Sequence, residues 1–396
     1  TVTVEKTMFA EVTGTATTLK NFQTAAAAAI TESPIIHMIK GDANVTIKNV
    51  INDVDVADAT KLAAGFVATT SGKVSLTMIN CVNNGDIQTK NQAAGILANG
   101  EGNLTIDFTD VVNNGNITGN KNYAGGIICA NGALDGTMTR VINNGDIYVE
   151  STMSTQKGSN AAGLIGTAKG IVSLTLDECV NTGAVTLVTT NTKAYYGVAG
   201  FAIRTDDTAS VFTLNNCVNT GVLTSETAPA IDAIAVPLKS GAAVATGCTY
   251  SSGTSTIAGA TKVDAATAEA SIAAIKAKMT LPEFDANKAP ETTAPEVTTS
   301  PEVDDTPFSA TVNAGFATAT IEGPSVLNVG ETGTITVTLD GDLSQFGVGF
   351  YSSNTSVADF TGTASAEVTP SGIAVMETVR TERRAFACGL LNTTTN

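Results

Sequence analysis

Apolar and polar residues alternate in short runs that recur along residues 35–250. Each run contains two apolar residues separated by a polar one. The pairs are Val45/Ile47, Leu76/Met78, Ile106/Phe108, Leu174/Leu176 and Phe212/Leu214, while Gly136/Met138 keeps half of the pattern. Alternation with a period of two over so few residues indicates a short strand with one buried face. The pattern therefore predicts many short strands separated by turns.

A second motif follows each alternating pair and recurs after 30 residues in the first copies and after 38 in the last two. It reads Cys-Val-Asn-Asn-Gly-Asp-Ile or a close variant, and its glycines are Gly85, Gly115, Gly145, Gly183 and Gly221. A third motif, Ala-Gly, keeps step with it at residues 64–65, 94–95, 124–125, 162–163 and 199–200. One such unit cannot bury its apolar face alone, but stacked units can, with each strand pairing in parallel with its equivalent in the next coil. We therefore predict an all-β fold dominated by a parallel β-helix of about six coils.

Stacking assigns a structural role to the recurring residues. The first asparagine of the motif is expected to form an amide ladder along the solenoid, through Asn83, Asn113, Asn143, Asn181 and Asn219. The glycine after it is expected to supply a positive φ at a coil corner. The residue two places later is always aliphatic, which predicts an internal stack of Ile87, Ile117, Ile147, Val185 and Leu223.

The remaining segments divide the chain into further parts. Residues 1–34 are expected to form a strand and an amphipathic helix that caps the first coil, because Leu19, Phe22, Ala26 and Ile30 lie near helical spacing. The β-helix repeats then occupy residues 35–260. Residues 261–285 are expected to form a helical cap or connector, and 286–308 a Pro/Thr/Glu-rich linker that cannot bury a core. Strand-like spacing beyond it predicts a small β-sandwich over residues 309–396.

Two parts of the chain resemble known bacterial families. The coil motif, an apolar strand followed by Cys-Val-Asn-Asn-Gly-Asp-Ile and Ala-Ala-Gly-Ile, resembles GLUG-like repeats of bacterial surface proteins, which implies a right-handed β-helix. Residues 318–373 look like a bacterial Ig-like domain of the Big2 type, through Val329-Gly-Glu-Thr-Gly-Thr-Ile-Thr-Val and Ser352-Ser-Asn-Thr-Ser-Val-Ala-Asp. The likeness fails after about residue 375, where 376–384 does not supply a good final strand, so the end of this domain is expected to be atypical or incomplete. Together these resemblances imply a secreted or wall-associated bacterial protein.

Composition narrows the possible partners. The formal net charge is −16 and only 15% of residues are charged, which argues against nucleic acid and anionic lipid, since both need clustered cations. No apolar run approaches the length of a bilayer-spanning helix, so no membrane insertion is expected. No Cys/His set or Asp-rich calcium loop is present, and we predict neither a metal nor a cofactor.

The sequence contains few candidates for catalysis. Asp86 and Asp146 occupy equivalent corners, and Asp110 and Glu178 share another position with Arg140 between them. Both pairs are two coils apart, about 10 Å at the strand spacing, which is at or beyond the usual separation of glycosidase carboxylates. A surface charge ladder is the simpler interpretation of the second pair. No catalytic residue is predicted.

Cysteines recur at one position of successive coils. Cys179, Cys217 and Cys248 are close enough for a disulfide in principle, but valines take the same place elsewhere, which favours a buried thiol stack.

Two insertions of about eight residues mark one point of the repeat, centred on residues 150–160 and 188–196. Insertions at one point of a solenoid stack onto one face, often the binding face. The second insertion carries Lys193, Tyr195 and Tyr196, a cation and two amphipathic rings that can contact a sugar or a protein. These three residues are the predicted ligand-binding site, and decorated loops without a ligand are the plainer alternative.

The sequence thus favours an extracellular or cell-surface bacterial protein that acts as an adhesin, a glycan- or protein-binding module, or a structural spacer. Its partner would be a glycan or a host or bacterial surface protein. The alternative is a β-helix polysaccharide lyase or glycoside hydrolase. The scarcity of acid pairs, aromatic residues and arginine-rich segments weighs against an enzyme without deciding the question.

Overall fold

A computed structural model describes most of residues 1–283 and the strands between residues 308 and 381. The gaps in the first part are residues 61, 121–122, 152–158, 190–196, 206–207, 226–229 and 240. The chain divides into two compact units, Thr1–Ala289 and Pro290–Asn396, which are described separately.

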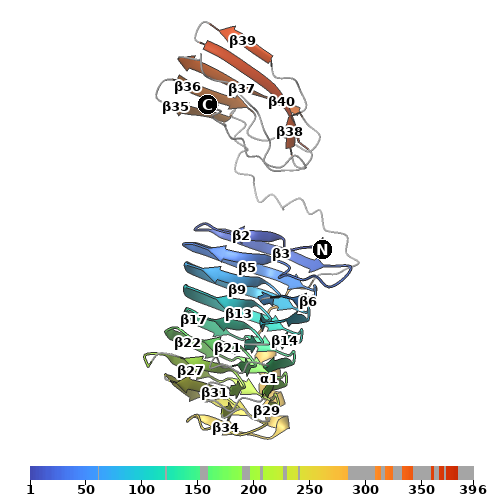
Figure 1. Cartoon of the computed structure of the whole chain (residues 1–396), viewed down its shortest axis with the longest axis vertical. Helices are drawn as coiled ribbons and strands as arrows, with labels where there is room; N and C mark the ends of the chain where they lie inside the picture. Colours follow the sequence, from blue (N-terminus) through green and yellow to red (C-terminus); the bar gives the residue numbers. More distant parts are fainter. Residues whose placement is uncertain are drawn as a thin grey trace. The chain divides into compact units, whose positions relative to one another are not determined.

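The first unit is a parallel β-solenoid with four sheets, and its strands stack coil upon coil (Figure 1). The first sheet contains β1 (Val2–Thr3), β3 (Thr17–Ala25), β5 (Ala43–Asn52), β9 (Lys73–Asn83), β13 (Asn103–Asn113), β17 (Ala133–Thr139), β18 (Ile142–Asn143), β22 (Val172–Asp177), β23 (Val180–Asn181), β27 (Val211–Asn215), β28 (Val218–Asn219), β32 (Ala242–Thr246), β33 (Cys248–Tyr250) and β34 (Ala260–Lys262).

The other three sheets complete each coil. The second sheet contains β6 (Val56–Ala59), β10 (Ile87–Thr89), β14 (Ile117–Gly119), β19 (Ile147–Ser151), β24 (Val185–Thr189) and β29 (Leu223–Ser225). The third contains β7 (Leu62–Ala64), β11 (Gln92–Ala94), β15 (Tyr123–Gly125), β20 (Asn160–Ala162), β25 (Gly197–Ala199) and β30 (Ala230–Asp232). The fourth contains β2 (Phe9–Val12), β4 (Ile36–Lys40), β8 (Val67–Ser71), β12 (Leu97–Gly100), β16 (Ile128–Ala130), β21 (Ile165–Ala168), β26 (Ala202–Thr205) and β31 (Ala235–Lys239).

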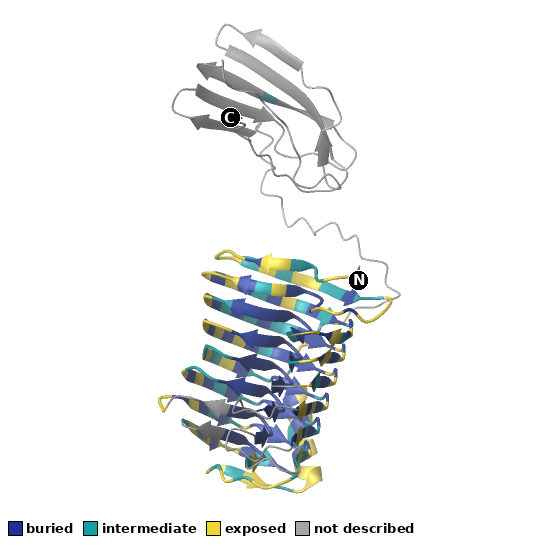
Figure 2. Ribbon diagram, in the orientation of Figure 1, coloured by how far each residue is buried: buried dark blue, intermediate teal, exposed yellow. Residues whose placement is uncertain are grey.

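In the described part of the chain, six coils contribute a strand to all four sheets, and partial coils flank them at both ends. The predicted parallel solenoid of about six coils is therefore confirmed. The alternating pairs lie in register from coil to coil, as in Leu76 beside Ile106 and Met78 beside Phe108. Their side chains fill the interior, and Figure 2 colours the strands of the middle coils largely as buried. The predicted aliphatic stack forms a second buried cluster that includes Ile87, Ile117 and Ile147.

A left-handed residue bends the first sheet once in every coil. Asn21, Asn49, Asn80, Asp110, Arg140, Glu178 and Asn216 all have φ between 50° and 59°. Because that residue turns the chain, the core-facing residues on either side of it are three positions apart, as in Phe108 and Val111. A strand with this corner therefore shows a spacing of three that imitates a helical face.

The predicted N-terminal capping helix is wrong for this reason. Residues 17–25 form strand β3, which pairs with β5 through Leu19 beside Ile47 and Phe22 beside Val50. The corner at Asn21, where φ is 59°, lies between Leu19 and Phe22 and gives their helix-like spacing. The segment is a rung of the solenoid, paired with β1 on one side and β5 on the other, rather than a plug on it.

The motif glycines are also explained differently from the prediction. Gly85, Gly115 and their equivalents do not have positive φ; the positive φ belongs to the non-glycine corner described above. At Gly115 an added Cβ would overlap the carbonyl oxygen of Gly85 in the coil before, and the same clash recurs along the column. The position therefore requires glycine because two backbones approach too closely for a side chain.

The Ala-Gly motif is shifted by one residue in one coil. Ala94 pairs with Gly125, so Gly95 is equivalent to Gly126 rather than to Gly125. A Cβ at Gly95 or Gly126 would overlap the asparagine ladder, which explains why this column is also glycine.

One helix, α1 (Ala265–Lys276), follows the last coil and lies along the side of the solenoid (Figure 1). Asp264 caps its first turn by accepting a hydrogen bond from the amide of Thr267 at 2.7 Å. Its buried residues Ala268, Ile272 and Ile275 pack on an apolar stripe of the first sheet. The stripe consists of Val82, Val112, Ile142, Val180 and Val218. The predicted helix is present, and it covers a lateral face of the solenoid, with residues 277–283 continuing its course; together they are called the strap.

The second unit contains an antiparallel sheet with the order β35-β36-β37-β40-β38, and β39 pairs with β40. Its strands are β35 (Phe308–Asn313), β36 (Ala317–Gly323), β37 (Thr332–Gly341), β38 (Ala358–Phe360), β39 (Ser365–Thr369) and β40 (Gly372–Thr381). Residues 376–381 of the segment expected to supply no good strand belong to β40, which pairs with β37 from Thr332–Arg380 to Leu339–Ile373. Residues 382–384 lie outside the described residues. Residues 286–307 of the expected linker lie outside the described residues, whereas residue 308 begins β35.

Candidate functional site

A ladder of buried asparagines runs along the inside of the solenoid. The Nδ2 atom of each donates to the Oδ1 atom of the next at 2.7–2.9 Å, from Asn83 through Asn113, Asn143 and Asn181 to Asn219. The ladder extends to Asn52, which donates to Asn83, and to Thr24, whose hydroxyl donates to Asn52. Each of Asn83, Asn113, Asn143 and Asn181 also donates to the carbonyl two residues on. All five predicted asparagines are fully buried, so the ladder serves the fold and presents nothing to a ligand.

The corner carboxylates are likewise engaged within the fold. An Oδ1 atom of Asp86 accepts from the amide of Asn116 at 2.7 Å, and Asp146 accepts from the amide of Ala184 at 2.8 Å. Each thus satisfies a backbone group of the following coil.

The second carboxylate set belongs to the corner column and to the strap. Arg140 donates through Nε to Asp110 at 2.6 Å. This hydrogen bond is the main reason that the pKa of Arg140 is raised. Glu178 forms an ion pair with Lys278, and Asp110 also accepts from the amide of Thr280 at 3.3 Å. The expected charge ladder therefore anchors the strap to the side of the solenoid.

The five described cysteines are free and buried. Cys81, Cys179, Cys217 and Cys248 share one column of the core, and no disulfide joins them. Burial raises the pKa of Cys81 and of Cys129 to about 12, so both stay protonated thiols at neutral pH. Burial also raises the pKa of Cys217, whose thiol interacts with those of Cys179 and Cys248.

The predicted ligand-binding residues Lys193, Tyr195 and Tyr196 lie outside the described residues, as does most of the first insertion. Among the described residues, no group of three or more His, Cys, Asp or Glu side chains could hold a metal ion. No helix in this described part is long and apolar enough to cross a membrane.

One outer face of the solenoid presents columns of small polar side chains. In the central column of the first sheet, threonine occupies six of seven successive rungs, in register from coil to coil. This hydroxyl column consists of Thr18, Thr46, Thr77, Thr137, Thr175 and Thr213, with Asp107 at the remaining rung. All are exposed or half-exposed. Of these threonine hydroxyls only that of Thr137 has a hydrogen-bond partner in the described chain, Asp107 at 3.1 Å.

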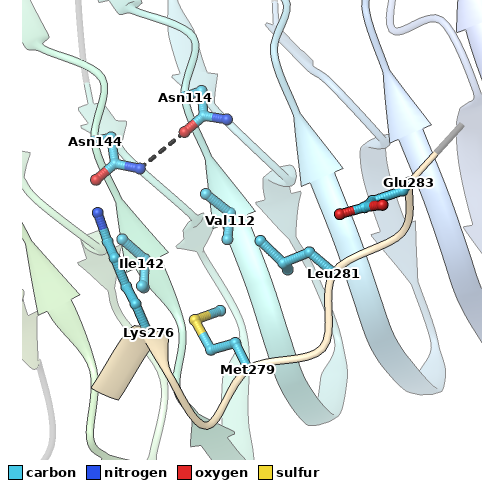
Figure 3. Close-up of a pocket in the computed structure, with 8 residues that line it drawn as sticks. All are labelled: Val112, Asn114, Ile142, Asn144, Lys276, Met279, Leu281 and Glu283. Atoms are coloured by element: carbon cyan, nitrogen blue, oxygen red, sulfur yellow. Dashed lines mark hydrogen bonds between the residues drawn. The ribbon is translucent and has the colours of Figure 1, made fainter. Parts of the chain in front are cut away.

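A groove lies between the strap and the wall of the solenoid (Figure 3). It has a volume of about 390 Å³. The wall contributes Val112, Ile142, Asn114 and Asn144, and the strap contributes Lys276, Met279, Leu281 and Glu283. Asn114 accepts from Asn144 at 2.8 Å and donates to Asn84 at 2.8 Å, so the carboxamides form a second, outer ladder. Lys276 and Glu283 lie toward opposite ends of the groove in Figure 3.

Sequence reasoning missed both surfaces. The hydroxyl column could have been predicted from the polar positions of the alternating strands, because the residue between each apolar pair is usually threonine. The groove could not be found in this way, since it depends on where the strap packs.

Comparisons with protein-family models, with curated proteins and with solved structures found no match.

Proposed function

We propose that this chain is an extracellular bacterial surface protein whose solenoid binds polysaccharide through the hydroxyl column. The observation that supports this proposal is the in-register column of threonines on a parallel sheet. Apart from that of Thr137, their hydroxyls have no hydrogen-bond partner among the described residues. A hydroxyl both donates and accepts, as sugar hydroxyls do, so each rung can exchange hydrogen bonds with a glycan. Successive rungs are about 4.8 Å apart, which offers one contact per coil to an extended repeating polymer.

The face is also preorganised for such a partner. Threonine is stiff at χ1, and its backbone here is fixed by parallel pairing on both sides, so little entropy is lost on binding. Each contact is weak, about 1 kcal/mol, but contacts repeated along one polymer act together. The resemblance to bacterial surface repeats and to a bacterial Ig-like domain supports the extracellular setting, and Lys193, Tyr195 and Tyr196 remain proposed auxiliary contacts.

The test is retention of the full chain on a panel of insoluble plant, fungal and mucosal polysaccharides. The triple variant Thr77→Val, Thr175→Val, Thr213→Val removes three hydroxyls while keeping side-chain size. The matched control, Thr118→Val, Thr186→Val, Thr224→Val, removes three hydroxyls from an outer column of the second sheet. We expect retention to fall at least about tenfold in the first variant and to be unchanged in the second.

Two outcomes contradict the proposal. Failure of the unmodified chain to bind any polysaccharide leaves a structural spacer as the better function. Retention that survives the first variant but disappears in Tyr195→Ala, Tyr196→Ala moves the binding face to the insertion loops. Release of soluble sugar during the same incubation would instead support the enzyme alternative.

A further inference from the structure

The groove beneath the strap has a chemistry different from that of the hydroxyl column. Its floor and one wall are apolar, formed by Val112 and Ile142 on the solenoid and by Met279 and Leu281 on the strap. Val112 and Ile142 are almost fully buried between the coils and the strap, so the apolar surface that the groove exposes comes chiefly from Met279 and Leu281. Such a surface accepts an aliphatic side chain and gives no support to a fully hydroxylated sugar ring.

Two opposite charges line the groove, and neither has a partner among the described residues. Lys276 and Glu283 are both exposed, and neither makes an ion pair or hydrogen bond within the described part of the chain. They lie at opposite ends of the groove, with the apolar residues between them (Figure 3). A ligand that matches both must therefore carry an anion at one end, a cation at the other and an apolar group between.

The outer carboxamide ladder supplies hydrogen bonds along the same groove. Asn114 and Asn144 each use one N–H on the neighbouring rung. A primary carboxamide has a second N–H and a second lone pair on its oxygen, which remain for a ligand. Carboxamides spaced along an extended groove are complementary to the amide groups of a peptide backbone.

We propose that this groove binds a short peptide with free termini and an aliphatic side chain. Its carboxylate pairs with Lys276, its ammonium with Glu283, and its side chain packs on Met279 and Leu281. The backbone amide bonds to the carboxamides of Asn114 and Asn144. The volume of about 390 Å³ lies at the small end of ligand sites, which suits a dipeptide or tripeptide. This site is separate from the hydroxyl column and does not depend on glycan binding.

Calorimetric titration of the full chain with Ala-Leu-Ala tests the proposal. The tripeptide is compared with its C-terminal amide and with its N-acetylated form. Lys276→Gln is expected to weaken binding of the free tripeptide at least about threefold, and to leave the affinity for the amide unchanged. Glu283→Gln is expected to act in the same way on the free tripeptide and to leave the N-acetylated form unchanged.

Lys73→Gln is the control, because Lys73 is an exposed lysine on the first sheet. It is expected to bind every peptide like the unmodified chain, and thermal melting verifies that each variant keeps the solenoid. The proposal is overturned if the unmodified chain shows no saturable binding at about 10 mM tripeptide. It is also overturned if Lys276→Gln weakens the binding of the free and the amidated peptide equally, because the lysine then does not interact with the peptide's carboxylate.

Discussion

At the scale of the residue, Asn113 serves three partners with one carboxamide. It accepts from Asn83, donates to Asn143 and donates to the carbonyl of Gly115, all at 2.7–2.8 Å. Because the site is fully buried, no water can replace a lost partner. The loss of this asparagine therefore costs stability mainly because it leaves buried polar groups unpaired, and less because of the strength of its own hydrogen bonds.

Replacing Asn113 by Ala is expected to lower the free energy of unfolding by roughly 3 kcal/mol, since it orphans groups on Asn83, Asn143 and Gly115. Asn114→Ala is the matched control: the neighbouring side chain is also part of a ladder, but it is exposed, and its loss should cost roughly 0.5 kcal/mol or less. Urea-induced unfolding of both variants measures the difference. Equal midpoints would show that burial does not decide the role of the ladder.

The same scale shows what the sequence could and could not reveal. The ladder was predictable, because asparagines that recur at one position of every repeat come to lie next to one another once the coils stack, and their side chains can then bond to each other. The role of glycine was not: its column has ordinary φ, and the need for it comes from the backbone of another coil about 30 residues away. The close approach of two coils at this position changes nothing in the local sequence pattern except that the residue is glycine.

At the scale of the element, the corner of the first sheet explains the main error. A left-handed residue inside a continuous strand separates core residues by three positions, and this produced a false helix at residues 17–30. The true helix, α1, lacks such a corner and has an N-cap at Asp264. Its existence was predictable from spacing, whereas its position along the wall depended on the apolar stripe and on the ion pair between Lys278 and Glu178.

The strap is expected to detach independently of the solenoid. Ile272→Ser with Ile275→Ser removes its two buried isoleucines, and a free helix of 12 residues is marginal in water. Hydrogen exchange should show loss of protection across 265–276 while β13 stays protected. Ala274→Ser, on the exposed side of the helix, is the control and should keep α1 protected. Loss of protection throughout the coils would contradict this independence.

At the scale of the whole molecule, the repeat divides its polar residues between two tasks. Buried asparagines and corner carboxylates hold successive coils together, whereas outward threonines repeat along one face with little use inside the fold. That division gives the first unit a periodic surface on one face of the solenoid. Periodicity was visible in the sequence, and the groove under the strap was not, because it is formed by segments more than 130 residues apart.

The most direct test of a periodic binding face is the affinity for oligosaccharides of increasing length, taken from whichever polysaccharide the chain retains. If each coil contributes one contact, the dissociation constant should fall with each added sugar and level off when the oligosaccharide spans the threonine rungs. The variant Thr77→Val, Thr175→Val, Thr213→Val should flatten this dependence. An affinity that is independent of length in the unmodified chain would contradict the account, because it would place binding at a single local site.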